Sequence, residues 1–418
     1  MISPYRKYRY TITCLLVLLS TACAPGNKLI GNPQAPYPLE TPPEVGQIVH
    51  LPTGVLVNEG QMLELATNNR IVYVGETHDN PASHRLQLTV IKAMAERYPG
   101  KVAIGMEMFT PAQDATLQEW TDGELTEKEF LKEVGWYKIW TSDYDLYRDI
   151  FEFAREQHVP IIGLNADKKT VKAVVISDFP ELPAETLEKI PEIDLTDPYH
   201  RAMTQSIYGG HGESEGMLAG FHRAQTLWDE TMAESIVRFL EQNEGSRIVV
   251  LAGGNHIRYG FGIPRRVFRR LPLPYISIGG KEIAVVEGKK PTYMDVTLPT
   301  FPMPPYDIQV FNHYEKLEMN EVKLGVMLEG KEGRVVVKTV VPGSNAERAG
   351  LLKNDIILTI DDENVLETFD LAYAIKQKKS GDKGSLEIKR GDETFMIEVD
   401  FEETPDLQST YHSHKDKK

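Results

Sequence analysis

The chain has 418 residues, and 61 acidic against 46 basic side chains give it a formal net charge of −15. This length exceeds that of one typical domain, and 41% hydrophobic with 26% charged residues is ordinary for soluble globular proteins, so we expect two folded units. The acidic balance argues against a nucleic-acid partner, because a protein of this charge repels phosphate backbones.

The N-terminus has the pattern of a secretory signal. A basic stretch at residues 6–9 precedes the apolar run 14–19, which is too short to cross a bilayer. The small residues that follow end in Cys23 and resemble a bacterial lipobox, in which the cysteine carries the lipid. We expect residues 1–22 to be removed and Cys23 to anchor the protein to the bacterial cell envelope. The alanine after the cysteine favours the outer membrane, facing the periplasm. An ordinary cleaved signal with an incidental cysteine is the alternative.

Cysteine usage limits the chemistry of the folded part. Cys14 and Cys23 are the two cysteines of the chain, and both lie in or beside the signal. The folded body therefore has no disulfide, no thiol nucleophile and no cysteine metal ligand.

Proline clusters predict the domain boundaries. Residues 23–48 are proline-rich and predict an extended tether, and a second cluster predicts a linker at residues 291–315. The last residues, 403–418, are polar and predict a disordered tail. The two folded domains are then expected at residues 49–290 and 316–402.

Short apolar runs alternate with amphipathic stretches in the first domain. The runs are residues 71–74, 102–106, 159–164 and 248–252, and the helical stretches are residues 83–98, 144–157, 168–175 and 217–242. This alternation predicts an α/β fold with a largely parallel sheet covered by helices on both faces.

Titratable side chains follow the apolar runs at the points where the strands end. Glu76 and His78 follow the first run, Glu107 follows the second, and His256 follows the fourth. The carboxyl ends of parallel strands form ligand sites, and both histidines occur in the form G-x-x-H. Histidine with carboxylates suits a divalent metal or general acid/base catalysis. We predict one site from these four residues; for each alone, a helix cap or a satisfied buried histidine is an equally good account.

A glycine-rich loop and the long helix supply further candidates. Tyr208 and His211 lie in or beside the loop, and His222 lies on a polar face of the helix. The aromatic stretch at residues 120–147 would suit an apolar planar ligand, although such residues more often form core.

Five strings occur in an order that resembles the ChaN family of bacterial lipoproteins. They are VGETHDNPASHRLQ, GMEMF, GLNAD, AQTLWDETMA and LAGGNHIRYGFGIP, and the resemblance extends from about residue 49 to residue 288. It implies haem binding and a role in iron uptake. It also implies membership of a wider superfamily, similar to Tiki proteases and erythromycin esterases, whose members use the residues corresponding to Glu76, His78, Glu107 and His256 for hydrolysis.

The resemblance also implies that a tyrosine holds haem at a dimer interface, which leaves a homodimer open. The candidate tyrosines are Tyr137, Tyr144, Tyr208 and Tyr259, with His211 and His222 as further haem contacts.

The sequence after the second proline cluster predicts a small β-dominated module. Its strands are expected at residues 335–341, 356–360, 386–389 and 395–399, with one helix at residues 368–378. The string VVPGSNAERAGLLKNDIILTIDDENV resembles a PDZ domain of the bacterial type. The resemblance implies that the loop formed by Leu324, Gly325 and Val326 receives the C-terminal carboxylate of a peptide or protein partner.

We therefore expect a membrane-anchored lipoprotein that binds haem or iron for iron acquisition and recruits a partner through its PDZ domain. The alternative is a metal-dependent hydrolase in which Glu76, His78 and His256 hold a divalent metal and Glu107 is the general base. In a third interpretation the α/β domain is a degenerate enzyme scaffold and assembly through the PDZ domain is the main function.

Overall fold

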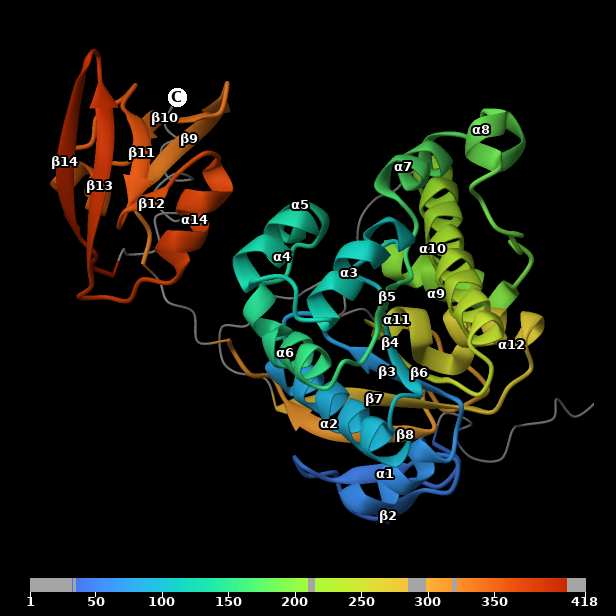
Figure 1. Ribbon diagram of the computed structural model, residues 1–418. Helices are drawn as coiled ribbons and strands as arrows, with labels where there is room; N and C mark the ends of the chain where they lie inside the picture. The colour runs from blue at the N-terminus through green and yellow to red at the C-terminus, as the bar shows by residue number, and fades with distance from the viewer. Residues whose placement is uncertain (1–31, 33–34, 210–214, 285–297, 318–321, 404–418) are drawn as a thin grey trace, which may run out of the picture. The chain divides into compact units, whose positions relative to one another are not determined.

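The structure is a computed structural model that describes residues 32, 35–209, 215–284, 298–317 and 322–403 (Figure 1). It contains a mixed, mostly parallel sheet of eight strands with helices, in the order β2-β1-β8-β7-β3-β6-β4-β5, and an antiparallel sheet of six strands. The chain divides into two compact units: residues up to Thr77 with Ala166–His313, and His78–Asn165 with the residues from Tyr314 onward. Among the described residues, no helix has the length and apolar character needed to cross a membrane.

Within the described residues the first unit has six strands, and it holds the long helix α10. The strands are β1 (Ile48–His50), β2 (Val55–Val57), β3 (Ile71–Glu76), β6 (Arg247–Gly253), β7 (Tyr275–Ala284) and β8 (Ile308–His313). The helices are α1 (Glu59–Thr67), α7 (Lys168–Ile176), α8 (Ala184–Leu187), α9 (Pro198–Tyr208), α10 (Glu215–Gln242), α11 (Gly254–Ile257) and α12 (Ile263–Arg270). Strands β3, β6 and β7 pair in parallel, and every residue of β3 is buried. The predicted apolar runs at 71–74 and 248–252 are thus central strands.

The second unit contains the rest of the α/β elements and the second domain. The former are α2 (Pro81–Arg97), β4 (Val102–Met106), α3 (Asp114–Thr121), α4 (Glu127–Glu133), α5 (Trp136–Ile139), α6 (Arg148–Glu156) and β5 (Ile161–Gly163). The second domain has β9 (Val326–Lys331), β10 (Arg334–Val340), α13 (Asn345–Arg348), β11 (Ile356–Ile360), β12 (Glu363–Asn364), α14 (Thr368–Lys376), β13 (Lys383–Arg390) and β14 (Glu393–Asp400).

Two segments differ from the sequence prediction. The helix predicted at residues 144–157 is a 3₁₀ turn, Tyr144–Leu146, followed by α6, because the side chain of Asp143 accepts a hydrogen bond from the Asp145 amide and starts a separate turn. Residues 308–313, within the stretch predicted as a linker, form strand β8, and Tyr306 just before it is buried. Prolines prevent regular hydrogen bonding in the preceding residues but do not prevent packing.

Candidate functional site

Glu76 and His256 lie at the carboxyl ends of neighbouring strands in the first unit. Glu76 is the last residue of β3, is 3% exposed, and stands opposite Gly253 in the parallel register with β6. Helix α11 begins immediately after β6 and carries His256, which is also buried. The structure therefore places Glu76 and the helix that carries His256 at the carboxyl ends of neighbouring strands, and a shared site for them stays a prediction.

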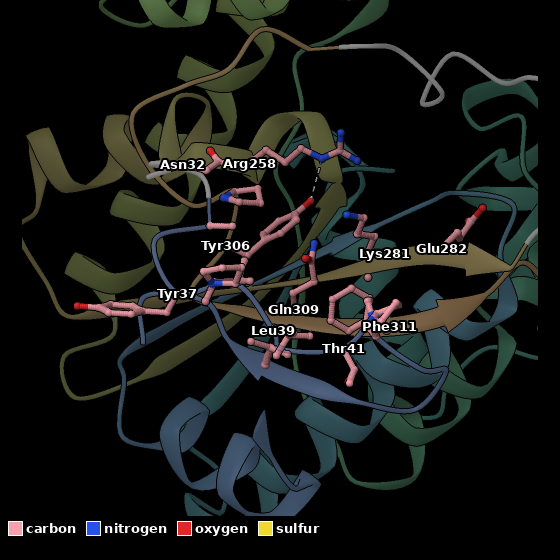
Figure 2. A pocket seen from close by; sticks show the side chains of 18 of the residues that line it. Asn32, Tyr37, Leu39, Thr41, Arg258, Lys281, Glu282, Tyr306, Gln309 and Phe311 are labelled. Atoms are coloured by element: carbon pink, nitrogen blue, oxygen red, sulfur yellow. Dashed lines mark hydrogen bonds between the residues drawn. The ribbon is translucent and has the colours of Figure 1, made fainter. Parts of the chain in front are cut away.

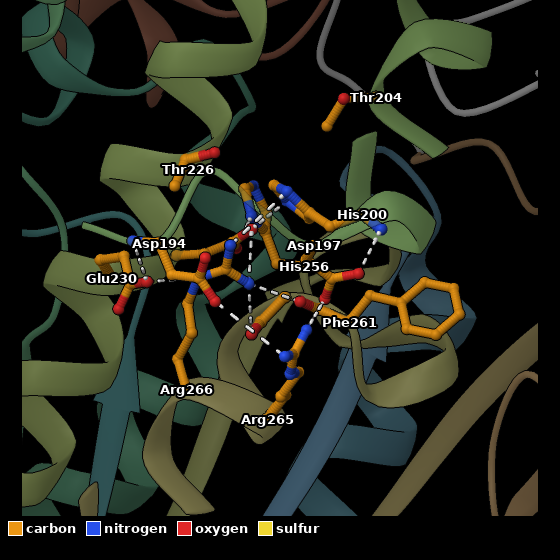
Figure 3. A network of polar contacts seen from close by, with 12 residues as sticks. Asp194, Asp197, His200, Thr204, Thr226, Glu230, His256, Phe261, Arg265 and Arg266 are labelled. Carbon is orange, nitrogen blue, oxygen red and sulfur yellow. Dashed lines mark hydrogen bonds and ion pairs between the residues drawn. The ribbon is translucent and has the colours of Figure 1, made fainter. Parts of the chain in front are cut away.

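The carboxylate of Asp229, on helix α10, accepts hydrogen bonds from His256 and from a second histidine. Its carboxylate lies 2.6 Å from His256 Nδ1 and 2.9 Å from His200 Nε2, and Figure 3 shows these two rings converging beside Arg266. Because an ionised carboxylate only accepts hydrogen bonds, each ring donates an N–H to it. In neutral His256 the proton is therefore on Nδ1, and Nε2 is the basic nitrogen.

Asp229 stays ionised although it is fully buried. Burial alone would raise the pKa of this carboxyl, but His256, the hydrogen bond from His200 and the Arg266 guanidinium together lower the pKa well below its usual value. A buried carboxylate that orients a histidine fixes the tautomer and raises the basicity of the ring. Sequence reasoning missed Asp229; its position two helical turns after His222 was the available signal.

A cluster of arginines fixes helix α12 against helix α10. The Glu230 carboxylate, fully buried, pairs with Arg269 at 3.1 Å and Arg270 at 2.7 Å. Arg265 pairs with Asp197 at the start of α9. The arginines of α12 therefore form ion pairs that connect this helix to α9 and α10. Arg266, on the same helix, lies beside Asp229.

A cavity of about 890 Å³ opens in the first unit (Figure 2). Aromatic and aliphatic side chains line it, among them Tyr37, Leu39, Phe311, Tyr306 and Tyr259. Two cations, Arg258 and Lys281, also line it. The segment at residues 35–43, predicted as tether, contributes one wall.

Tyr306 lies over the ends of three strands in this cavity. A Cβ added at Gly279 of β7 would lie 2.3 Å from its ring, and one added at Gly254 would lie 2.8 Å from its hydroxyl oxygen. Glycine is therefore required at these positions by the close approach of the ring. The Tyr306 hydroxyl accepts a hydrogen bond from Arg258 Nε at 3.2 Å, as the dashed line in Figure 2 shows.

Tyr259 lines the same cavity in an unusual backbone conformation. Its φ is +58°, in the left-handed region that side-chain-bearing residues rarely adopt, and its ring is half-buried against Phe301, with ring centroids 4.8 Å apart. Burial raises the pKa of the Tyr259 hydroxyl, and the positive charge of Arg258 opposes that shift. Backbone strain of this kind is often kept at functional positions.

His78 and Glu107 belong to the second unit. The His78 ring meets Trp140 edge to face, with centroids 5.0 Å apart, and its backbone carbonyl accepts a hydrogen bond from His84. Glu107 follows β4, is 7% exposed, and its carbonyl accepts a hydrogen bond from Asn165. The cap of α2 is Asn80, whose side chain accepts from the Ala82 amide, so a capping role does not explain His78.

The other predicted haem contacts are spread over the fold. Tyr208 ends α9 and is buried against Phe221, and Tyr144 is fully buried in the aromatic cluster with Phe151. Tyr137 is 46% exposed on α5. His211 and Cys23, the residue predicted to carry lipid, lie outside the described residues. Of the four candidate tyrosines, Tyr259 lines the large cavity.

Metal ligation was the other role predicted for the strand-end residues. Among the residues that the structure describes, no group of three or more His, Cys, Asp or Glu side chains is placed to hold a metal ion. A metal role for Glu76, His78 and His256 stays a prediction.

The second domain presents an edge strand beside a helix. Strand β9 ends its sheet and lies next to α14, so its outer side is open to an added strand. Leu324 is buried and its carbonyl accepts from the Ala346 amide. Gly325 has φ +81°, and a Cβ there would lie 2.2 Å from Ser344 Cβ. The loop before β9 therefore needs glycine at this position.

Two family models match the chain. Residues 62–267 match the model described as haem-binding uptake, Tiki superfamily, ChaN, and residues 322–401 match the PDZ domain. No curated protein matches the chain.

Solved structures resemble each part. A ChaN of Campylobacter jejuni with cofacial haem binding is 14% identical, with a TM-score of 0.48, over 63% of this chain and 95% of that one. A serine endoprotease from Yersinia pestis is 20% identical, with a TM-score of 0.19, over 20% of this chain and 30% of that one. The HtrA3 PDZ domain bound to a phage-derived ligand is 19% identical, with a TM-score of 0.18, over 19% and 85%.

Proposed function

Because residues 62–267 of this protein form a ChaN-type domain of the haem-binding uptake family and residues 322–401 form a PDZ domain, we propose that the protein binds haem in the cavity beside Tyr259 and presents it to a partner held by the PDZ domain. The observation that carries the proposal is the cavity itself, which combines an aromatic wall, two cations and a strained tyrosine.

The residues present fit the chemistry of haem. Ligand pockets are typically about 300–1,000 Å³, and the cavity of about 890 Å³ falls in this range, with aromatic side chains beside polar and charged ones in its lining. The macrocycle would face aromatic side chains such as Phe311, and Arg258 and Lys281 would pair with the two propionates. When bound, haem would supply an iron that a tyrosine oxygen can ligate.

Tyr259 is the residue that we propose would hold the haem iron. It is half-buried at the wall of the cavity, and the neighbouring Arg258 guanidinium favours the tyrosinate form against the effect of burial. The left-handed backbone conformation of Tyr259 interrupts the helical backbone at this residue. Strained conformations of this kind are often kept at functional sites.

Haemin titration of the mature protein, followed by visible absorption, tests this assignment. We expect Tyr259→Phe to weaken haemin affinity at least tenfold and to shift the absorption band. Tyr208→Phe is the matched control, because Tyr208 is buried elsewhere and does not line the cavity. Equal affinities and bands for the wild type and Tyr259→Phe would contradict the assignment.

We further propose a location and role. Lipidation at Cys23 would hold the protein at the outer membrane facing the periplasm, where haem binding serves iron acquisition. The support is the lipobox-like sequence before Cys23. Incorporation of labelled palmitate into the wild type, and its loss in Cys23→Ser, is the expected result; no incorporation in the wild type would contradict it.

The PDZ domain is proposed to recruit a protein C-terminus. The peptide would add as a strand to β9, with its carboxylate at the loop of Leu324 and Gly325. A free C-terminal peptide should bind, and the same peptide amidated at its C-terminus should not.

A hydrolase is the second candidate, and the pair of Asp229 with His256 favours it. A buried carboxylate that fixes Nδ1–H leaves Nε2 as a general base beside Glu76 at the strand ends. Turnover of ester or peptide substrates that is lost in His256→Gln, with haemin affinity unchanged, would favour hydrolysis over haem binding.

A further inference from the structure

A second, smaller cavity lies in the first unit between helices α9 and α10. Its volume is about 140 Å³, and Arg201, Thr204 and His222 are among its lining residues. An engineered cavity of about 150 Å³ holds one benzene molecule, so this cavity suits a ligand of roughly six heavy atoms. It is too small for haem, and it is separate from the cavity of Tyr259.

His222 provides a buried polar group in this cavity. The side chain is 7% exposed, and Nδ1 lies 3.0 Å from the Thr204 hydroxyl. Within the described residues Nε2 is buried without a hydrogen-bond partner. A buried polar atom left without a partner costs free energy, which a ligand in the cavity would recover.

The charges around His222 favour an anion. Burial, helped by the positive charges of His200 and Arg201 of α9 and Arg266 of α12 and opposed by the backbone of Leu195, lowers the pKa of His222 to about 4. The acid in the lining, Asp178, is already paired with Arg223 of α10. Among the described lining residues the charge that remains is that of Arg201, which favours an anion in the cavity.

We propose that this cavity binds a small oxyanion, a monocarboxylate or phosphate, between the exposed guanidinium of Arg201 and the buried imidazole of His222. Arg201 supplies a charge-assisted hydrogen bond, and His222 supplies a second contact at the buried end. The anion also favours the protonated imidazole, so binding and protonation of His222 strengthen each other.

Histidine NMR of the full mature chain tests the proposal, with formate and inorganic phosphate as separate probes. Ring carbons of histidine are labelled with ¹³C, and His222→Gln assigns the signal. We expect one of the two anions to raise the pKa of His222 by about one unit, which corresponds to tenfold tighter binding to the protonated ring. The affinity should rise as the pH falls from 7 toward 4. Formate alone or phosphate alone identifies the class of ligand.

Two arginine variants complete the experiment. Arg201→Gln should weaken anion binding at least tenfold, and Arg238→Gln should leave it unchanged, because Arg238 is exposed on α10 and does not line the cavity. A pKa of His222 that neither anion moves would overturn the proposal, as would binding that survives Arg201→Gln. Haemin affinity of both variants, measured in parallel, reports on the proposed function separately.

Discussion

Replacing Asp229 should be among the most destabilising changes in the ChaN-type domain. Its carboxylate, 1% exposed, accepts hydrogen bonds from His200 and His256, which reach it from two different helices, and Arg266 lies 4.0 Å away. Asp229→Ala would leave these donors facing an apolar methyl group. Asp229→Asn would keep one acceptor oxygen and turn an amide N–H₂ toward the other donor.

The magnitude follows from the two hydrogen bonds. Bonds to a charged group contribute about 1.5–3 kcal/mol each, and removing one partner of a buried charged pair costs about 3–5 kcal/mol. We therefore expect Asp229→Ala to lower the free energy of unfolding by about 3–5 kcal/mol. Asp229→Asn should lower it by about 1.5–3 kcal/mol.

Urea denaturation followed by tryptophan fluorescence measures this loss selectively. The four tryptophans, Trp120, Trp136, Trp140 and Trp228, all lie within residues 62–267, so the signal reports on the ChaN-type domain and not on the PDZ domain. The ring of Trp228 is 6.3 Å from that of His256. Asp178→Asn is the control, because Asp178 is 67% exposed and its ion pair should contribute less than about 1 kcal/mol.

The pH dependence gives the same prediction an independent check. The folded-state pKa of Asp229 is lowered, so the stability that this carboxylate provides is present above the unfolded aspartate pKa of about 3.9 and is lost as the pH falls below it. The difference between wild type and Asp229→Asn should be constant from pH 7 to pH 5 and shrink in stronger acid. A loss of unfolding free energy below about 1 kcal/mol in Asp229→Ala at pH 7 would contradict this stabilising role of the carboxylate.

Three further changes test other parts of the structure. Gly279→Ala should cost about 1–3 kcal/mol in the same denaturation assay, because its Cβ would lie 2.3 Å from the Tyr306 ring; a wild-type midpoint would argue against this packing. Gly325→Ala should abolish binding of a fluorescent C-terminal peptide, whereas Gly343→Ala, with a similar φ of +75° and nothing within 4 Å, should retain it; equal loss in both would implicate the backbone conformation alone. His222 has a folded-state pKa of about 4, below its unfolded value of about 6.5, so the wild type should lose up to about 3 kcal/mol as the pH falls through this range. His222→Phe should not show that loss, and identical pH slopes would disprove the role of the ring.

Local patterns predicted the central strands and the main helices well. The apolar runs of β3 and β6 are buried on both faces of the sheet. A strand buried on both faces has a continuous apolar sequence, so these two strands could be predicted. Strand β7 was missed because Gly279, Gly280 and Lys281 interrupt its apolar pattern, and the glycines are needed there by the approach of Tyr306 and Asn312.

The positions of Glu76 and His256 at strand ends were predicted from the sequence, whereas contacts between distant segments were missed. Glu76 and His256 follow directly from the rule that polar residues gather at the carboxyl ends of parallel strands. Helical spacing puts Asp229 on the same polar face as His222, but its two histidine partners were not predicted, because they lie 29 residues before and 27 residues after it in sequence. Tyr306 lies in a stretch that its prolines marked as a linker, and composition carries no signal for a buried ring.

Whether haem binds at Tyr259 can be measured directly. The wild-type chain, mixed with excess haemin and passed through gel filtration, should retain haem with a visible absorption band, and Tyr259→Phe should lose the haem or show a different band. A wild type that emerges without haem, or a Tyr259→Phe variant with the same haem content and the same band, would contradict the assignment of this cavity.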